Sequence, residues 1–261
     1  MFRFFISVLL SQVLFSAAAM ADSSRPISIC VDVDPPPPGM IKRDASGNKI
    51  IPVEGASVDI VRAAFAHLGQ TVVFQGDLPW NRCLKEVELG SVDFALGAYF
   101  NEERTAIFDY SVHYSTLTPQ VFYLVSNPVI ATVADDLKKY RGCGIYGSSY
   151  QHYQLQAKDL DLGSDYDSLY RKLLAKHCDY FLEELEAVYD SYTGKKFLAE
   201  PSVRHYTAEW AQSPSRHLLT AKNSANSALL GKINDALNYV LKSGQAELAW
   251  KRYMGDLPFR P

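Results

Sequence analysis

Residues that can bind a small charged molecule gather in five segments of the sequence, at positions 35–38, 78–82, 97–104, 147–150 and 183–184. Apart from the first, which is a run of prolines, they supply arginines, acids, serines and aromatic side chains. An arginine forms two parallel hydrogen bonds with a carboxylate, an opposed acid can hold an ammonium, and aromatic rings can enclose an apolar stem. This combination favours a receptor for a small zwitterion or carboxylate.

The elements expected around these segments alternate between strands and helices, which is typical of a sheet whose parallel strands are joined by crossover helices. Ligands of such sheets usually lie in the loops after the strands, where the five segments fall. Asn101 is expected to cap a short helix. The apolar patterns predict strands at 27–33, 71–75, 93–97, 120–125, 143–146, 178–182 and 217–221, helices at 57–68, 79–90, 164–176 and 227–242, and a last helix that ends at Met254.

Composition and the N-terminus indicate an exported globular protein. The 261 residues are 48% hydrophobic and 21% charged, which excludes a disordered or collagen-like chain. A net charge of −3 gives no reason to expect a nucleic acid or an acidic membrane surface as partner. Arg3, an apolar run and Ala19-Met20-Ala21 predict a secretory signal peptide at residues 1–21, and therefore a periplasmic protein without membrane insertion after cleavage. An N-terminal membrane anchor is the alternative, although the apolar run is short and interrupted.

The sequence contains little that indicates dinucleotide binding, a metal site or nucleophilic catalysis. Residues 142–147 match the dinucleotide motif G-x-G-x-x-G, but the segment before them is charged rather than strand-like. The six histidines show no metal-ligand spacing, and no nucleophile–base pair can be recognised. We therefore expect neither a cofactor nor a metal. The state of the four cysteines is open at this point.

Several motifs resemble those of one protein family. Trp80-Asn81-Arg82, residues 88–93, Asn101-Glu102-Glu103-Arg104 and the aromatic segment 108–114 follow one another at the spacing found in the extracellular solute-binding proteins of polar amino-acid ABC transporters. Residues 147–150 and 179–184 fit the second half of the same pattern. The resemblance implies an α/β fold of the type II periplasmic-binding-protein class, with two lobes, parallel-dominated sheets, flanking helices and two hinge crossings. Lobe one would comprise residues 25–117 and 215–261, and lobe two residues 118–214.

The resemblance also implies roles for single residues. Arg104 would bind a ligand carboxylate, Ser149 would donate to it from lobe two, Glu184 would hold an ammonium, and Trp80 would pack against the ligand stem. Further candidates for the pocket wall are Arg82, Tyr99, Ser148 and Tyr150.

Structural roles are the alternatives for these residues. Arg104 could pair with an acid at the surface, Glu184 could lie on a solvated helix, and Trp80 could belong to the core. The sequence also departs from the family pattern. Ala98-Tyr99-Phe100 replaces the usual small hydroxyl residue, and Glu184 is longer than the usual Asp. A bulky, flat or differently spaced ligand is therefore an alternative to an ordinary α-amino acid.

The family topology also suggests how the cysteines pair. Cys30 and Cys83 would both lie in lobe one, and Cys143 and Cys178 would lie on neighbouring strands of lobe two. We predict the disulfides Cys30–Cys83 and Cys143–Cys178, neither of which would cross the hinge.

The expected function is that of a monomeric periplasmic binding protein. It would capture a small polar, carboxylated solute by lobe closure and dock transiently to a membrane ABC permease. Two alternatives are a dehydratase-like enzyme on the same fold, with Glu183 or Glu184 as acid or base, and a sensor that presents its ligand to a membrane receptor.

Overall fold

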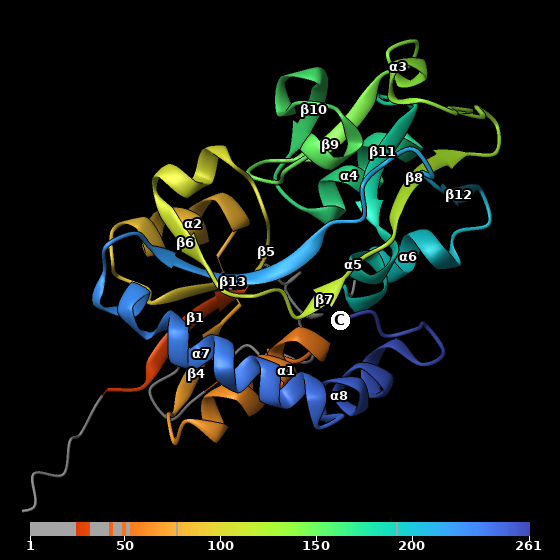
Figure 1. Ribbon diagram of the computed structural model, residues 1–261. Helices are drawn as coiled ribbons and strands as arrows, with labels where there is room; N and C mark the ends of the chain where they lie inside the picture. Colours follow the sequence, from red (N-terminus) through yellow and green to blue (C-terminus); the bar gives the residue numbers. More distant parts are fainter. Residues whose placement is uncertain (1–24, 32–41, 44–48, 51–52, 77, 192) are drawn as a thin grey trace, which may run out of the picture.

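The computed structural model describes residues 25–31, 42–43, 49–50, 53–76, 78–191 and 193–261. The predicted signal peptide at 1–21 and the proline run at 35–38 lie outside these residues. Figure 1 shows two α/β lobes, each built around its own sheet. The two-residue strands β2 (Lys42–Arg43) and β3 (Lys49–Ile50) pair with each other as a separate antiparallel ribbon.

The first lobe contains the sheet β4-β1-β5-β13-β6, with β7 paired to β13. Strand β1 lies parallel to β4 and β5, whereas β13 lies antiparallel to β5, β6 and β7. Its helices pack beside this sheet (Figure 1). The strands are β1 (Ile27–Val31), β4 (Val72–Gln75), β5 (Phe94–Tyr99), β6 (Phe108–Tyr110), β7 (Ser115–Thr116) and β13 (Ser215–Ala221), and the helices are α1 (Ala56–His67), α2 (Trp80–Glu88), α7 (Ala225–Lys242) and α8 (Gln245–Met254), with a 3₁₀ turn at Glu103–Ala106.

The second lobe contains the sheet β10-β9-β11-β8-β12. Strand β9 lies parallel to β10 and β11, and β8 lies antiparallel to β11 and β12. Both sheets are therefore mixed. The strands are β8 (Pro119–Leu124), β9 (Gly142–Ile145), β10 (Leu160–Gly163), β11 (Tyr180–Glu184) and β12 (Val203–Thr207), and the helices are α3 (Ala134–Leu137), α4 (Tyr166–Leu174), α5 (Leu185–Asp190) and α6 (Gly194–Ala199), with 3₁₀ turns at Gln151–Tyr153 and Ala157–Asp159.

Local sequence explains where the helices begin and end. Helix α7 follows Ser224, whose hydroxyl accepts a hydrogen bond from the backbone N–H of Ser227 at 3.1 Å. The chain turns at Gly244, with a φ of 79° that favours glycine. Helix α4 begins after Asp165, which accepts from the backbone N–H of Ser168 at 2.7 Å, so the cap is Asp165 and not the predicted Ser164. A carboxylate and a hydroxyl can both cap a helix, which leaves the exact residue undetermined by sequence.

The chain crosses between the lobes twice, between β7 and β8 and between β12 and β13 (Figure 1). Because β13, α7 and α8 follow the second crossing, the first lobe is discontinuous in sequence. The disulfides Cys30–Cys83 and Cys143–Cys178 are both present, as predicted, and each stays within one lobe. Among the described helices, none combines the length and the apolar character needed to cross a membrane.

Candidate functional site

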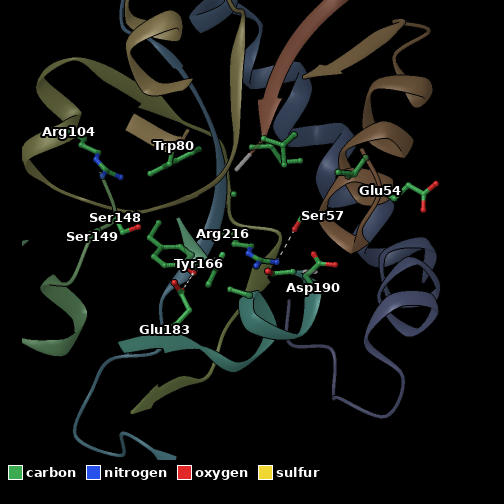
Figure 2. Close-up of a pocket in the computed structure, with 17 residues that line it drawn as sticks. Glu54, Ser57, Trp80, Arg104, Ser148, Ser149, Tyr166, Glu183, Asp190 and Arg216 are labelled. Atoms are coloured by element: carbon green, nitrogen blue, oxygen red, sulfur yellow. Dashed lines mark hydrogen bonds between the residues drawn. The ribbon is translucent and has the colours of Figure 1, made fainter. Parts of the chain in front are cut away.

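A pocket lies between the two lobes and is lined by residues from both (Figure 2). Its cavity volume is about 110 Å³. One water needs about 10–15 Å³ of such space, so the pocket has room for a small molecule. The wall combines apolar side chains with arginines, acids and serines, as ligand sites usually do.

Arg104 and two serines form one part of the pocket (Figure 2). The backbone N–H of Arg104 donates to Oδ1 of Asn101 at 3.2 Å, which fixes the 3₁₀ turn that carries the arginine. The Arg104 guanidinium donates to the carbonyl oxygen of Gly147 in the second lobe. Asn101 also donates from Nδ2 to Ser149 Oγ at 3.3 Å. Burial lowers the pKa of Arg104 from its ordinary value, so an anion bound here would relieve the cost of burying its charge.

A second arginine, Arg216, lies in another part of the same pocket (Figure 2). It stands near the start of β13, is 7% exposed, and donates to Ser57 Oγ at 3.1 Å. Asp190 approaches from the second lobe and packs so tightly on Gly55 that a Cβ there would lie 3.1 Å from its carboxylate oxygens. Burial raises the pKa of Asp190, and the positive charge of Arg216 opposes this rise.

Glu183 lies on the pocket wall contributed by β11. The hydroxyl of Tyr99, from the first lobe, donates to Glu183 Oε1 at 3.5 Å. Burial raises the pKa of Glu183 well above its ordinary value, and the neighbouring charge of Glu184 adds to the rise. The environment of Glu183 therefore favours its protonated form, which can donate a hydrogen bond.

Comparison with known proteins identifies the family. Residues 27–256 match the sequence model of the bacterial extracellular solute-binding proteins, family 3. The chain belongs to this family. The match covers almost all of the described residues and confirms the resemblance inferred from the motifs. No curated protein sequence matches the chain.

Solved structures of similar fold include binding proteins and a sensor. A histidine kinase sensor domain with similarity to periplasmic binding proteins is 23% identical, with a TM-score of 0.69 over 91% of this chain and 98% of that one. The arginine-, lysine-, histidine-binding protein ArtJ from Geobacillus stearothermophilus is 16% identical, with a TM-score of 0.68 over 90% and 97%. An ancestral arginine-binding protein bound to arginine is 22% identical, with a TM-score of 0.68 over 88% and 98%. At these identities the likeness shows the type II periplasmic-binding-protein fold.

Five of the residues predicted from the sequence line the pocket of this family member. Three of them come from the first lobe, from α2, from β5 and from the 3₁₀ turn at Glu103–Ala106. The other two come from the loop after β9 in the second lobe. Trp80, at the start of α2, is 6% exposed and also packs in the apolar cluster around Cys30 and Cys83. Its pocket role and its core role therefore coexist. The five residues are Trp80, Tyr99, Arg104, Ser148 and Ser149.

Three predicted residues are not part of the pocket wall. Glu184 is 1% exposed, and its Oε1 lies 2.7 Å from His152 Nε2. Tyr150 is buried in the second lobe, where its hydroxyl accepts from the backbone N–H of Ile145 at 2.6 Å. Arg82 is exposed and lies 3.5 Å from Glu86 on the next turn of α2. Each of the three is thus placed by a contact outside the pocket.

Sequence reasoning missed much of the charged wall. Adjacent residues on a strand point to opposite faces, so only the register of β11 decides that Glu183 rather than Glu184 lines the pocket. Arg216 falls one residue before the predicted strand at 217–221, and Asp190 lies in a helix that no pattern marked. Among the described residues, no cluster of three or more histidines, cysteines or acids could hold a metal.

Proposed function

We propose that this protein captures a small polar, carboxylated solute between its lobes and delivers it to an ABC transporter. The observation that carries the proposal is the position of Arg104, at the pocket wall beside Ser148 and Ser149 of the opposite lobe. A guanidinium matches the geometry of a carboxylate, and serine hydroxyls can complete its hydrogen bonds.

We infer lobe closure because the contacts to the ligand would come from both lobes. Arg104 donates to Gly147, Asn101 to Ser149 and Tyr99 to Glu183, and all three contacts join the two lobes. A ligand carboxylate would replace the Gly147 carbonyl as partner of Arg104 and would add contacts to both lobes. Because such a ligand binds the closed form better than the open form, it shifts the population toward closure.

The protein would work outside the cytoplasm. The proposed signal peptide at residues 1–21 directs it to the periplasm, where both disulfides can persist. We further propose that it acts as a monomer, because transient docking of the closed form to a permease needs only one copy of the two-lobe unit.

Native mass spectrometry of protein purified from the periplasm tests this function. We expect one bound small molecule that carries a carboxylate, that raises the melting temperature of ligand-free protein, and that is recovered unchanged after incubation. Chemical conversion of the molecule would favour an enzyme on the same fold. A ligand without any acidic group would contradict the role proposed for Arg104.

The similarity to a histidine kinase sensor domain supports a second candidate, a protein that presents its ligand to a membrane receptor. The two functions differ in whether the cell needs this protein to take up the solute. Deletion of the gene should abolish uptake of the identified solute if the protein serves a transporter, and should leave uptake unchanged if it serves a receptor.

A further inference from the structure

Arg216 is a buried cation that forms no ion pair with the described acids, although the charge of Asp190 favours its charged form from a longer distance. Its side chain is 7% exposed, and the hydrogen bond recorded for its guanidinium goes to the neutral hydroxyl of Ser57. Among the described acids, no carboxylate oxygen lies within ion-pair distance of it. A buried guanidinium without a close counter-ion is costly, and such a group on a pocket wall is suited to bind an anion.

Arg216 lies in a different part of the pocket from Arg104, which is proposed to bind the carboxylate of the solute. Figure 2 shows Arg104 beside Ser148 and Ser149, and Arg216 beside Ser57 and Asp190. Each guanidinium thus has its own neighbours in the pocket, so each can hold a carboxylate of its own. The Arg216 part also contains the carboxylate of Asp190, which can accept hydrogen bonds from an ammonium.

The charged groups that line the pocket also restrict the net charge of the ligand. Arg104 and Arg216 bring two guanidinium groups to the pocket, and Glu183 and Asp190 bring two carboxyl groups whose pKa values are both raised by burial. Glu54 is exposed at the rim and is screened by water. Because guanidinium groups stay charged while burial disfavours the ionised carboxyls, the pocket favours a ligand that carries more negative than positive charge.

We propose that Arg216 forms a second anion subsite and that the preferred solute is an amino dicarboxylate. Its terminal carboxylate binds Arg104, its α-carboxylate binds Arg216, and its ammonium lies beside Asp190. This inference rests on the proposed function, because it assumes that Arg104 holds a carboxylate in the same pocket. It adds a second acidic group and a required amine to the ligand.

Titration calorimetry of the processed protein with a series of defined probes tests the inference. The series contains 2-amino dicarboxylates of four to seven carbons, their α-amides and terminal amides, dicarboxylates without the amine, and amino acids with one carboxylate. We expect one amino dicarboxylate to bind tightest. Each of its amides should bind about tenfold to a hundredfold more weakly, as loss of a charge-assisted contact implies.

Substitutions at the two arginines assign each carboxylate. Arg216→Gln should weaken binding of the best amino dicarboxylate by about tenfold to a hundredfold and remove its advantage over the α-amide, while its advantage over the terminal amide persists. Arg104→Gln should show the opposite pattern. A merely structural role of Arg216 would weaken all probes equally.

Further variants keep the test decisive if Arg216→Gln does not fold. Ser57→Ala removes one hydrogen bond of Arg216 and should keep the preference for two carboxylates. Asp190→Asn should weaken binding of the amino dicarboxylate more than binding of the matching dicarboxylate without the amine. The wild-type series alone also decides, because equal affinity for amino acids with one carboxylate would overturn the inference.

The outcomes separate the inference from the proposed function. Tight binding of a monocarboxylate that depends on Arg104 but not on Arg216 would overturn the second subsite and leave the proposed function intact. Failure of every amino dicarboxylate to bind would also overturn the second subsite. Absence of any carboxylated ligand would overturn both.

Discussion

Nε2 of His152 lies 2.7 Å from Oε1 of Glu184, and this contact is part of why two adjacent acids on β11 have different environments. Burial by itself would raise the pKa of Glu184, but His152 and the hydrogen bonds to its carboxylate lower it to about 2. Glu183 lies on the pocket side of the strand, where it accepts a hydrogen bond from the hydroxyl of Tyr99 at 3.5 Å. Burial and the negative charge of Glu184 raise the pKa of Glu183 well above its ordinary value.

Replacing Glu183 should make stability less sensitive to rising pH. A carboxyl whose folded-state pKa is raised stabilises the protein fully below its unfolded pKa, near 4.5, and loses this contribution as pH rises through the folded pKa. Glu183→Gln does not titrate, so it should gain stability relative to wild type above pH 4.5, by up to about 1.4 kcal/mol per pH unit. Urea unfolding of ligand-free protein at pH 5, 7 and 9 measures this. A stability difference that stays constant, or that falls with pH, would contradict the assignment.

The carboxylate of Asp93 should stabilise the first lobe near neutral pH. It accepts hydrogen bonds from Arg25 at 2.7 Å, from the backbone N–H of Ser28 at 2.8 Å and from Asn226 at 2.8 Å. Burial opposes the charged form, but these contacts lower the pKa of Asp93 to about 2. Asp93→Asn should therefore lower the free energy of unfolding at pH 7 by about 1.5–3 kcal/mol.

We also expect the stability lost in Asp93→Asn to depend on pH. A carboxyl with a depressed folded pKa contributes stability above its unfolded pKa, 3.8, and loses it as pH falls toward about 2. The difference between Asp93→Asn and wild type should thus shrink across this range. Arg25→Ala is the matched control and should cost much less than Asp93→Asn, because Arg25 is 69% exposed and water screens its ion pair. An equal cost for both variants would mean that the ion pair, and not the buried hydrogen bonds, stabilises this site.

Each disulfide should stabilise its own lobe without affecting closure. The bridges Cys30–Cys83 and Cys143–Cys178 span 53 and 35 positions within one lobe each. Replacing either pair with serines should lower the free energy of unfolding by about 2–4 kcal/mol. The stabilisation by a saturating ligand should stay within experimental error of wild type. A variant that unfolds as wild type does but loses ligand binding would show that the bridge positions the pocket instead.

The sequence supported the fold further than it supported the site. Periodic apolar residues, such as Leu230, Ile233 and Leu237 on α7, mark elements independently of their neighbours. The pocket depends instead on how elements are placed. The register of β11 turns Glu183 rather than Glu184 to the pocket, and the placement of the second lobe beside the first brings Asp190 against Gly55. Arg104 can be recognised because Asn101-Glu102-Glu103-Arg104 resembles a motif of the family, whereas Arg216 stands alone in a strand.

The melting-temperature shift of two arginine variants with the identified solute tests the central claim most directly. Arg104 lines the pocket, whereas Arg82 is exposed on α2 and does not. We expect Arg82→Ala to keep the full wild-type shift and Arg104→Ala to lose most of it, with both variants folded. A full shift for Arg104→Ala, or equal losses for the two variants, would contradict the claim that Arg104 anchors the solute between the lobes.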